Sequence, residues 1–155
     1  MSLTIYKKKR KFSLTTEPSG KTIKKSGKSL AFVIHEHHAS HLHWDLRLEM
    51  NGTLKSWAVP KTPENLKTPG TKRLAVQVED HPIEYAKFHG SIPEGNYGAG
   101  EVKIWDNGKY EMLEKTPKKL IFELHGKKLK GKYILVKTGY GGKKSGWLWF
   151  KISSS

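Results

Sequence analysis

Hydrophobic and polar residues alternate along short segments from residue 30 onward. The clearest case is residues 41–50, where the even positions hold Leu, Trp, Leu, Leu and Met and the odd positions hold His, His, Asp, Arg and Glu. A period of two is typical of a β-strand with one face in a hydrophobic core. The pattern predicts strands over residues 30–36, 42–50, 53–59, 73–80, 101–106, 109–113, 120–125, 132–138 and 147–152.

Turn-forming residues separate these predicted strands. Asn51-Gly52 joins two alternating segments and predicts a tight hairpin. Further turns are expected at residues 106–108, 126–131 and 139–146, which all contain glycine. No segment has convincing helical periodicity, so we expect helical turns to be short. Closing into a barrel is the simplest way to protect the edges of so many strands, and we therefore predict a mainly β, small closed barrel of about eight strands.

Positive charge gathers at the two ends of the chain. The 155 residues carry a net charge of +15, divided into +8 over residues 1–30, −3 over residues 31–114 and +10 over residues 115–155. Residues 1–29 show no strand or helix period, so we expect a basic N-terminal arm that packs on one domain of residues 30–155. Cationic ends around a slightly acidic centre suit a polyanion such as DNA, although two solvated basic surfaces are the alternative.

Length and composition exclude several classes of protein. One domain is too small for a multidomain polymerase, ligase or nucleotide triphosphatase. The chain has no cysteine, which excludes disulfides, thiolate metal sites and a cysteine nucleophile. No apolar run approaches the length of a membrane span and no secretory signal is visible, so we expect a soluble cytoplasmic protein that does not act at a membrane.

Five of the eight histidines fall within residues 35–43. His43 and Asp45 share one face of the predicted strand, and His37 can fold back through the intervening turn to join them. Two imidazoles and a carboxylate without a thiolate indicate a catalytic metal site with open positions, suited to Mn²⁺, Zn²⁺, Fe²⁺ or Co²⁺. The alternative is a surface histidine cluster that binds nickel by accident.

Three further side chains are candidates for phosphate chemistry. Arg47 lies two positions beyond Asp45 on the same face, where a guanidinium can hold a phosphate oxygen, although an ion pair with Glu49 or with a neighbouring strand is the alternative. His81 and Tyr85 leave a predicted strand in a turn and are candidates for phosphate binding or proton transfer. A loop anchored by the tyrosine hydroxyl explains them equally well. The glycine-rich residues 92–100 give only a weak phosphate-loop signal.

The sequence resembles the 3′-phosphoesterase domain of bacterial DNA ligase D and its small stand-alone relatives. The resemblance runs from about Arg10 to Tyr110 and continues weakly through Trp149. It is carried by HEHHASHLHWDLRLEMNGTLKSWAVPK (35–61), KRLAVQVEDHP (72–82) and IPEGNYGAGEVKIWDNG (92–108). The resemblance implies a manganese-dependent enzyme on a small β-barrel. Such an enzyme removes a terminal ribonucleoside from a primer strand and converts the remaining 3′-phosphate to a 3′-hydroxyl in end joining.

The resemblance also implies roles for individual residues. It places the metal ligands at His37, His43 and Asp45, with His43 also counted among the catalytic residues. It implies phosphate contacts and catalysis by Arg47, His81 and Tyr85, and substrate binding by Arg10, Glu17, Lys61 and Arg73. Two positions depart from the family pattern: Lys11 stands where an acidic residue is common, and His35 stands where an amide is expected.

The expected partners are the 3′ ends of DNA or DNA/RNA primer-templates, with a separate DNA ligase and polymerase acting on the product. Two other classes of function stay open at this point. One is a noncatalytic nucleic-acid-binding module with a structural metal ion. The other is a metal hydrolase of a small phosphorylated molecule, for which the charge of +15 would be incidental.

Overall fold

The fold is taken from a computed structural model that describes residues 30–92, 100–138 and 145–152. Nine strands occupy most of this part of the chain, with two short 3₁₀-helices, η2 (Pro63–Lys67) and η3 (Ile83–Lys87). The strands are β1 (Leu30–His38), β2 (Leu42–Met50), β3 (Thr53–Val59), β4 (Lys72–His81), β5 (Gly90–Ile92), β6 (Gly100–Thr116), β7 (Lys119–His125), β8 (Lys130–Lys137) and β9 (Gly146–Lys151). The predicted arm, including Arg10, Lys11 and Glu17, lies outside the described residues, as do most of the glycine-rich segment and of the 139–146 turn.

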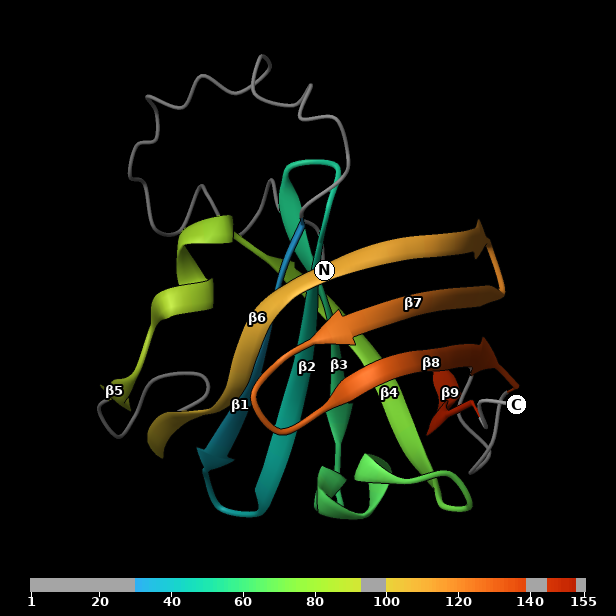
Figure 1. The fold of residues 1–155 in the computed structure, drawn as a ribbon. Coiled ribbons are helices and arrows are strands. Elements are labelled where there is room, and N and C mark those ends of the chain that lie inside the picture. The colour runs from blue at the N-terminus through green and yellow to red at the C-terminus, as the bar shows by residue number, and fades with distance from the viewer. Residues whose placement is uncertain (1–29, 93–99, 139–144, 153–155) are drawn as a thin grey trace.

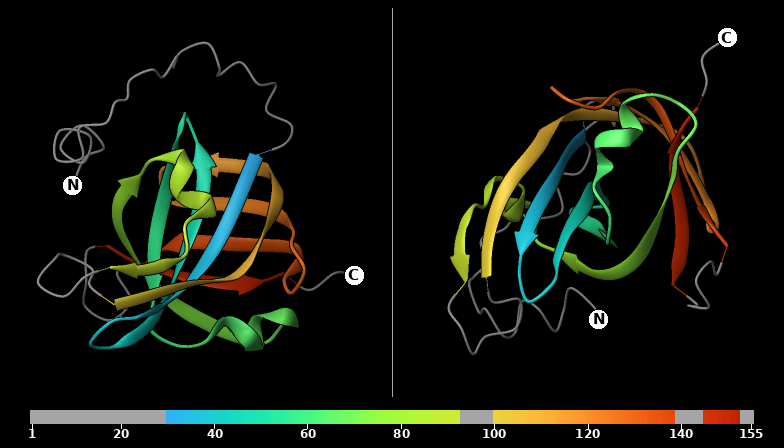
Figure 2. Two further views of the ribbon diagram at one scale, coloured as in Figure 1. Left: turned by 90° about the vertical axis from the view of Figure 1, so that its left-hand side faces the viewer. Right: turned by 90° about the horizontal axis from the view of Figure 1, so that it is seen from below.

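Eight of these strands close into an antiparallel barrel (Figure 1). Their order around the wall is β1-β2-β3-β4-β9-β8-β7-β6, and β6 then pairs with β1. The short β5 lies outside this ring and pairs with the first residues of β6, Gly100–Val102, whose other edge pairs with the end of β1. Figure 2 shows from two further directions how the strands wrap around a common centre. The predicted closed β-barrel with short helical turns is confirmed.

The alternation in β2 separates a hydrophobic face from a polar one. Trp44, Leu46, Leu48 and Met50 all belong to the core cluster that fills the barrel. The Asn51-Gly52 hairpin is also present, since Met50 pairs with Thr53 and both turn residues have positive φ, 50° and 80°. Positive φ at two successive turn positions matches the right-handed twist of the strands that such a turn joins.

Large aromatic side chains complete the core. The largest fully buried ones are Trp57, Trp149, Tyr110, Tyr133, Phe32 and Phe122. The two tyrosine hydroxyls donate to backbone carbonyls, Tyr110 to Glu49 at 2.6 Å and Tyr133 to Leu66 at 2.7 Å. A buried hydroxyl needs such a partner, because the lost hydration is otherwise not replaced. Burial also disfavours the charged form of a tyrosine, so it raises the pKa of both tyrosines above its ordinary value.

The expected turn at residues 106–108 is wrong, because these residues lie inside the 17-residue strand β6. The Asp106 carboxylate instead accepts the backbone N–H groups of Lys127, Lys128 and Leu129, at 2.8 to 3.2 Å. A side chain added at Gly108 would meet the carbonyl oxygen of His125 on β7. Asp106 therefore holds the neighbouring β7–β8 turn, and Gly108 allows β6 and β7 to lie close together. The three-residue β5 was not anticipated.

Within the residues that the structure describes, no helix has the length and hydropathy required to cross a lipid bilayer.

Candidate active site

The polar face of β1 and β2 lies on the outside of the barrel wall, yet it is buried. The antiparallel register places His37 opposite His43 and His35 opposite Asp45. Helix η3, yellow-green in Figure 1, contacts β1 and β3 from outside the barrel. The exposed fraction is 0% for His35, 5% for Asp45 and 4% for Arg47. Charged side chains buried to this extent require partners, because desolvation of an unpaired charge is costly.

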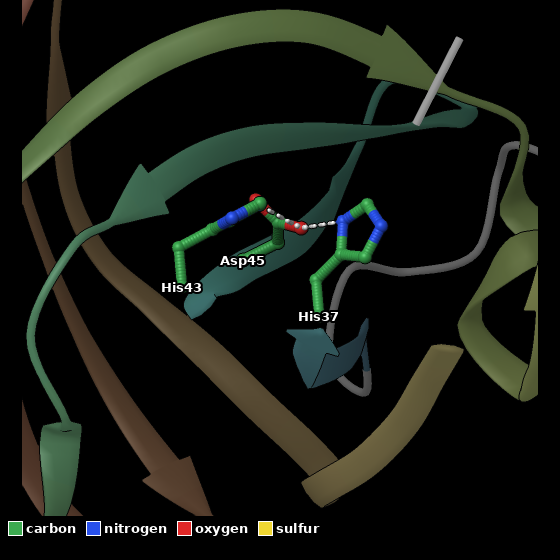
Figure 3. A group of neighbouring side chains, drawn as sticks. All are labelled: His37, His43 and Asp45. Atoms are coloured by element: carbon green, nitrogen blue, oxygen red, sulfur yellow. Dashed lines mark ion pairs between the residues drawn. The ribbon is translucent and has the colours of Figure 1, made fainter. Parts of the chain in front are cut away.

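His37, His43 and Asp45 converge at one end of this face (Figure 3). The Asp45 Oδ2 atom lies 3.3 Å from His43 Nε2 and 3.8 Å from His37 Nδ1, and one ligand atom from each residue lies within 4.8 Å of the others. His43 Nδ1 is 3.1 Å from the carbonyl oxygen of His41. A proton on Nδ1 would be donated to this carbonyl, which leaves Nε2 free to bind a metal, as is common for metal-binding histidines.

The donor set fits a divalent metal ion. Two imidazole nitrogens and a carboxylate oxygen suit Mn²⁺, Zn²⁺ or Co²⁺, and the ligand types do not choose among them. Among the described residues, this group includes no fourth His, Cys, Asp or Glu. Three protein ligands are typical of a catalytic site that keeps positions open for water or substrate.

The charges in this group support one another. Burial acts to raise the pKa of the Asp45 carboxyl, but its interactions with His37 and His43 and the charge of Arg47 hold this pKa well below its ordinary value. The bond to Asp45 in turn raises the pKa of His43. The carboxylate is therefore ionised at neutral pH, as a metal ligand must be.

Arg47 is the centre of a second, adjoining network. Its Nε donates to His35 Nδ1 at 3.0 Å, and its Nη2 donates to Asp45 Oδ2 at 3.3 Å. Its Nη1 donates to Ser56 Oγ at 2.9 Å and is 3.1 Å from His81 Nδ1. The ion pair of Arg47 is with Asp45, whereas Glu49 Oε1 accepts from the backbone N–H of Ala31. The contacts of Arg47 to the neighbouring strands β1 and β3 are hydrogen bonds to His35 and Ser56. Arg47 thus joins the metal-binding group to His81.

The protonation state of His35 follows from its two contacts. An arginine N–H can only donate, so His35 Nδ1 accepts from Arg47 and the ring proton sits on Nε2. Nε2 then donates to the carbonyl oxygen of Phe88 at 2.9 Å. Burial and the Arg47 charge lower the pKa of His35 to about 4, and the same two causes lower the pKa of His81 to about 3. Both imidazoles are therefore neutral at pH 7.

We expect the metal-free protein to lose stability as the pH falls from about 6.5 to about 4. In this window an unfolded His35 binds a proton that the folded His35 does not bind, so protonation favours unfolding. Its pKa change from 6.5 to about 4 corresponds to about 3 kcal/mol in the free energy of unfolding. Urea denaturation in EDTA at several pH values measures this slope. The His35→Asn variant should have a shallower slope by about one proton, and an unchanged slope would contradict the assignment.

The Tyr85 ring packs against the Arg47 guanidinium. The Tyr85 ring centre lies 4.9 Å from Arg47 Cζ, 5.2 Å from the His35 ring centre and 4.9 Å from the His81 ring centre. Phe88 stacks on Tyr85 with ring centres 4.9 Å apart. Stacking on an aromatic face is a common way to hold a guanidinium. The structure thus brings together three predicted site residues from separate segments of the sequence: Arg47, His81 and Tyr85.

Lys61 and Arg73 lie at one end of the barrel. Lys61 follows Val59, whose cross-strand partner is Trp44, so Lys61 lies at the end of the wall where His43 is found. Arg73 Nε donates to the carbonyl oxygen of Thr62 at 2.9 Å. Lys61 is exposed and Arg73 is half-buried. Their predicted role in substrate binding stays a prediction.

Sequence reasoning missed Ser56 and Phe88. Ser56 has an exposed fraction of 0% and lies directly opposite Arg47 in the β2–β3 register. Pairing back from the Asn51-Gly52 hairpin would have placed it there, because a two-residue turn sets the register of both strands. Phe88 contributes a backbone oxygen and a ring, and no sequence signal marks such a role.

A second acidic and histidine group lies elsewhere on the barrel, on β6 and β7. It consists of Glu111, Glu123 and His125, of which the first and last are exposed. Exposed carboxylates are common on protein surfaces, and no described feature of this group indicates a ligand.

The fold and the site together define a small β-barrel with a largely buried group of two histidines and an aspartate that could hold a metal ion, beside an arginine network. The family model for the DNA Ligase D 3′-phosphoesterase domain matches residues 35–137, and the chain belongs to this family. The matched segment contains every described residue of the site.

Whole-protein relatives agree with this membership. The chain is 49% identical over 156 residues to the multifunctional non-homologous end joining protein LigD of Pseudomonas aeruginosa, which covers 96% of this chain and 18% of that protein. It is 51% identical over 148 residues to LigD of Mycolicibacterium smegmatis, covering 88% of this chain and 19% of the relative. The chain therefore spans less than a fifth of the length of these relatives.

Proposed function

We propose that this protein is a metal-dependent 3′ end-healing phosphoesterase that acts in DNA repair. In this proposal it removes a 3′-terminal ribonucleoside, a 3′-phosphate or both from a DNA primer strand and leaves a 3′-hydroxyl. The observation that carries the proposal is the junction of the His37, His43 and Asp45 group with the Arg47 network. A cation site next to a guanidinium matches the two kinds of positive charge that phosphoryl transfer requires.

A divalent ion held by His37, His43 and Asp45, most simply Mn²⁺, would polarise a phosphate oxygen and lower the pKa of water. Arg47, His81 and Tyr85 would stabilise negative charge on the other oxygens of the phosphorus centre. Four N–H contacts of Arg47 are already used within the protein. Arg47 therefore acts chiefly through its charge and through the groups that it orients.

His81 is the preferred proton donor to the leaving oxygen. Without substrate it is neutral, because burial and the charge of Arg47 lower its pKa to about 3. A bound phosphate brings negative charge next to the ring and raises this pKa, so the ring takes up a second proton when substrate is present and can then pass that proton to the leaving oxygen. The neutral ring otherwise serves as a hydrogen-bond donor.

Basic surfaces would hold the duplex by its phosphates. In the described residues, lysines are frequent on β7, β8 and the turns beside them, among them Lys118, Lys119, Lys127, Lys128, Lys130 and Lys132. Binding of DNA should weaken steeply with salt, because each neutralised phosphate releases counterions. The 3′-hydroxyl product would be extended by a DNA polymerase and joined by a DNA ligase in the cytoplasm.

The proposal predicts a metal-dependent change in one DNA strand. A duplex with a recessed strand that ends in a ribonucleotide should be shortened in the presence of Mn²⁺, and EDTA or the His43→Ala substitution should abolish the change. A parallel duplex with a 3′-phosphate separates diesterase from monoesterase activity. The products are resolved on a denaturing gel. An intact strand in the Mn²⁺ lane, with DNA still bound, would support a noncatalytic binding module instead.

A further inference from the structure

The Arg47 Nη1 nitrogen lies next to two side chains. It donates to Ser56 Oγ at 2.9 Å and lies 3.1 Å from His81 Nδ1. Ser56 is fully buried, and its own hydroxyl hydrogen is donated to the carbonyl oxygen of Leu54 at 3.2 Å. This bond fixes the hydroxyl rotor, so the oxygen lone pairs of Ser56 are turned toward Arg47.

His81 Nδ1 lies between two groups that demand opposite protonation states. Arg47 Nη1 can only donate, whereas the carbonyl oxygen of Glu79, also at 3.1 Å, can only accept. A neutral imidazole satisfies one of them. If Nδ1 accepts from Arg47, the ring proton is on Nε2; if Nδ1 donates to Glu79, Nε2 carries a lone pair instead. The choice decides whether the far edge of His81 is a donor or an acceptor.

We propose that Ser56 is a positioning residue that sets the tautomer of His81 through Arg47. By accepting one Nη1 hydrogen, Ser56 keeps the guanidinium plane oriented so that the second hydrogen points at His81 Nδ1. His81 then carries its proton on Nε2, the tautomer that can donate a hydrogen bond from Nε2 to a phosphate oxygen. This role rests on the proposed function for its consequence in catalysis, but the hydrogen-bond arrangement is independent of any reaction.

The other contacts of Arg47 involve different nitrogen atoms of the guanidinium. Nε is held by His35 and Nη2 by Asp45, at the two other corners of the guanidinium. Neither of these contacts involves Nη1. Ser56 lies on β3, on the side of Arg47 toward β4 and His81, and holds Nη1 through its hydroxyl oxygen.

A pair of variants of equal shape tests the inference. Ser56→Thr keeps the hydroxyl, whereas Ser56→Val replaces it with a methyl group of similar size, so the steric cost of the extra carbon is common to both. Nitrogen-15 NMR of the metal-free protein distinguishes protonated from unprotonated ring nitrogens. We expect the His81 Nδ1 signal to stay unprotonated in the native and Thr proteins and to move toward the protonated position in the Val protein.

The exposed His125, on β7, serves as an internal reference whose signals should not change. Equal His81 signals in the Thr and Val proteins would overturn the inference. If the Val protein does not fold, Ser56→Ala, which adds no bulk, is compared with the native protein by the same measurement and the same criterion.

Kinetics provide the second readout. With a 3′-phosphate duplex and Mn²⁺, we expect kcat of the Val protein to fall about tenfold or more while KM changes little, and the Thr protein to recover most of the loss. A matching loss in the Thr and Val proteins would contradict a role for the hydroxyl. Should the native protein leave the duplex unchanged, the proposed function fails, but the NMR comparison still decides whether Ser56 sets the His81 tautomer.

Discussion

Replacing Asp45 by asparagine is expected to lower kcat on a 3′-phosphate duplex by roughly 10²- to 10³-fold and to weaken Mn²⁺ binding strongly. The carboxylate lies between His37 and His43 and is the negatively charged member of the group. An amide keeps the shape of the side chain but supplies no charge to hold a cation. Calorimetric titration with Mn²⁺ measures binding, and a phosphate-release assay measures kcat.

The same substitution should also destabilise the metal-free protein, because it leaves the buried Arg47 without its counter-ion. Breaking a buried ion pair costs about 3–5 kcal/mol in the free energy of unfolding. Activity is therefore compared at a temperature where urea denaturation shows the variant to be folded. Glu111→Gln, in the exposed group on β6 and β7, is the matched control and should change neither quantity. Undiminished Mn²⁺ binding by the Asp45→Asn protein would refute the assignment of the site.

The second large effect concerns stability. Asp106→Ala is expected to lower the free energy of unfolding by about 3–5 kcal/mol, because one carboxylate accepts four backbone N–H groups. Three of these groups belong to the β7–β8 turn, at residues 127–129, and Leu129 is fully buried. Without the carboxylate, the turn would lose these three hydrogen bonds to β6. The midpoint and slope of urea denaturation give the change.

Glu114→Gln is the control for this prediction. Glu114 lies on the same strand β6, and its ion pair with Lys119 is exposed, so its removal should cost at most about 1 kcal/mol. Equal losses for the two variants would show that Asp106 acts through general electrostatics and not through its hydrogen bonds to the turn. The turn also packs closely against Asp106 at Gly126, where an added side chain would meet Asp106 and Phe32.

Much of the fold could be predicted from the sequence, because alternation and turn preferences depend on only a few neighbouring residues. Alternation in β2 predicted which residues face the core, and Asn51-Gly52 predicted a hairpin. The same rules failed at residues 106–108, where Asp, Asn and Gly have the composition of a turn but lie within a continuous strand. Asp and Gly are common in turns because Asp accepts backbone hydrogen bonds and Gly permits close approach. Here Asp106 accepts from the β7–β8 turn, and Gly108 permits the close approach of β6 to His125.

The candidate site divides along a similar line. His43 and Asp45 share a strand face through spacing alone, so their convergence with His37 could be expected from residues 37–45. The burial of this face could not be expected from the sequence, because alternation defines two faces of a strand and does not say what covers either one. The burial that lowers the pKa of His35 and His81 depends on that cover.

By itself, then, the chain's period of two, its hairpin signal and its histidine spacing predicted a β-barrel and three residues, His37, His43 and Asp45, that could hold a metal ion. Only the tertiary structure decided that Arg47 joins this trio to His81, with Ser56 from β3 and the backbone of Phe88 as supports. The physical reason is the range of the forces involved. Backbone geometry repeats over two residues, whereas hydrogen bonds between side chains depend on which strands are neighbours and in what register they pair.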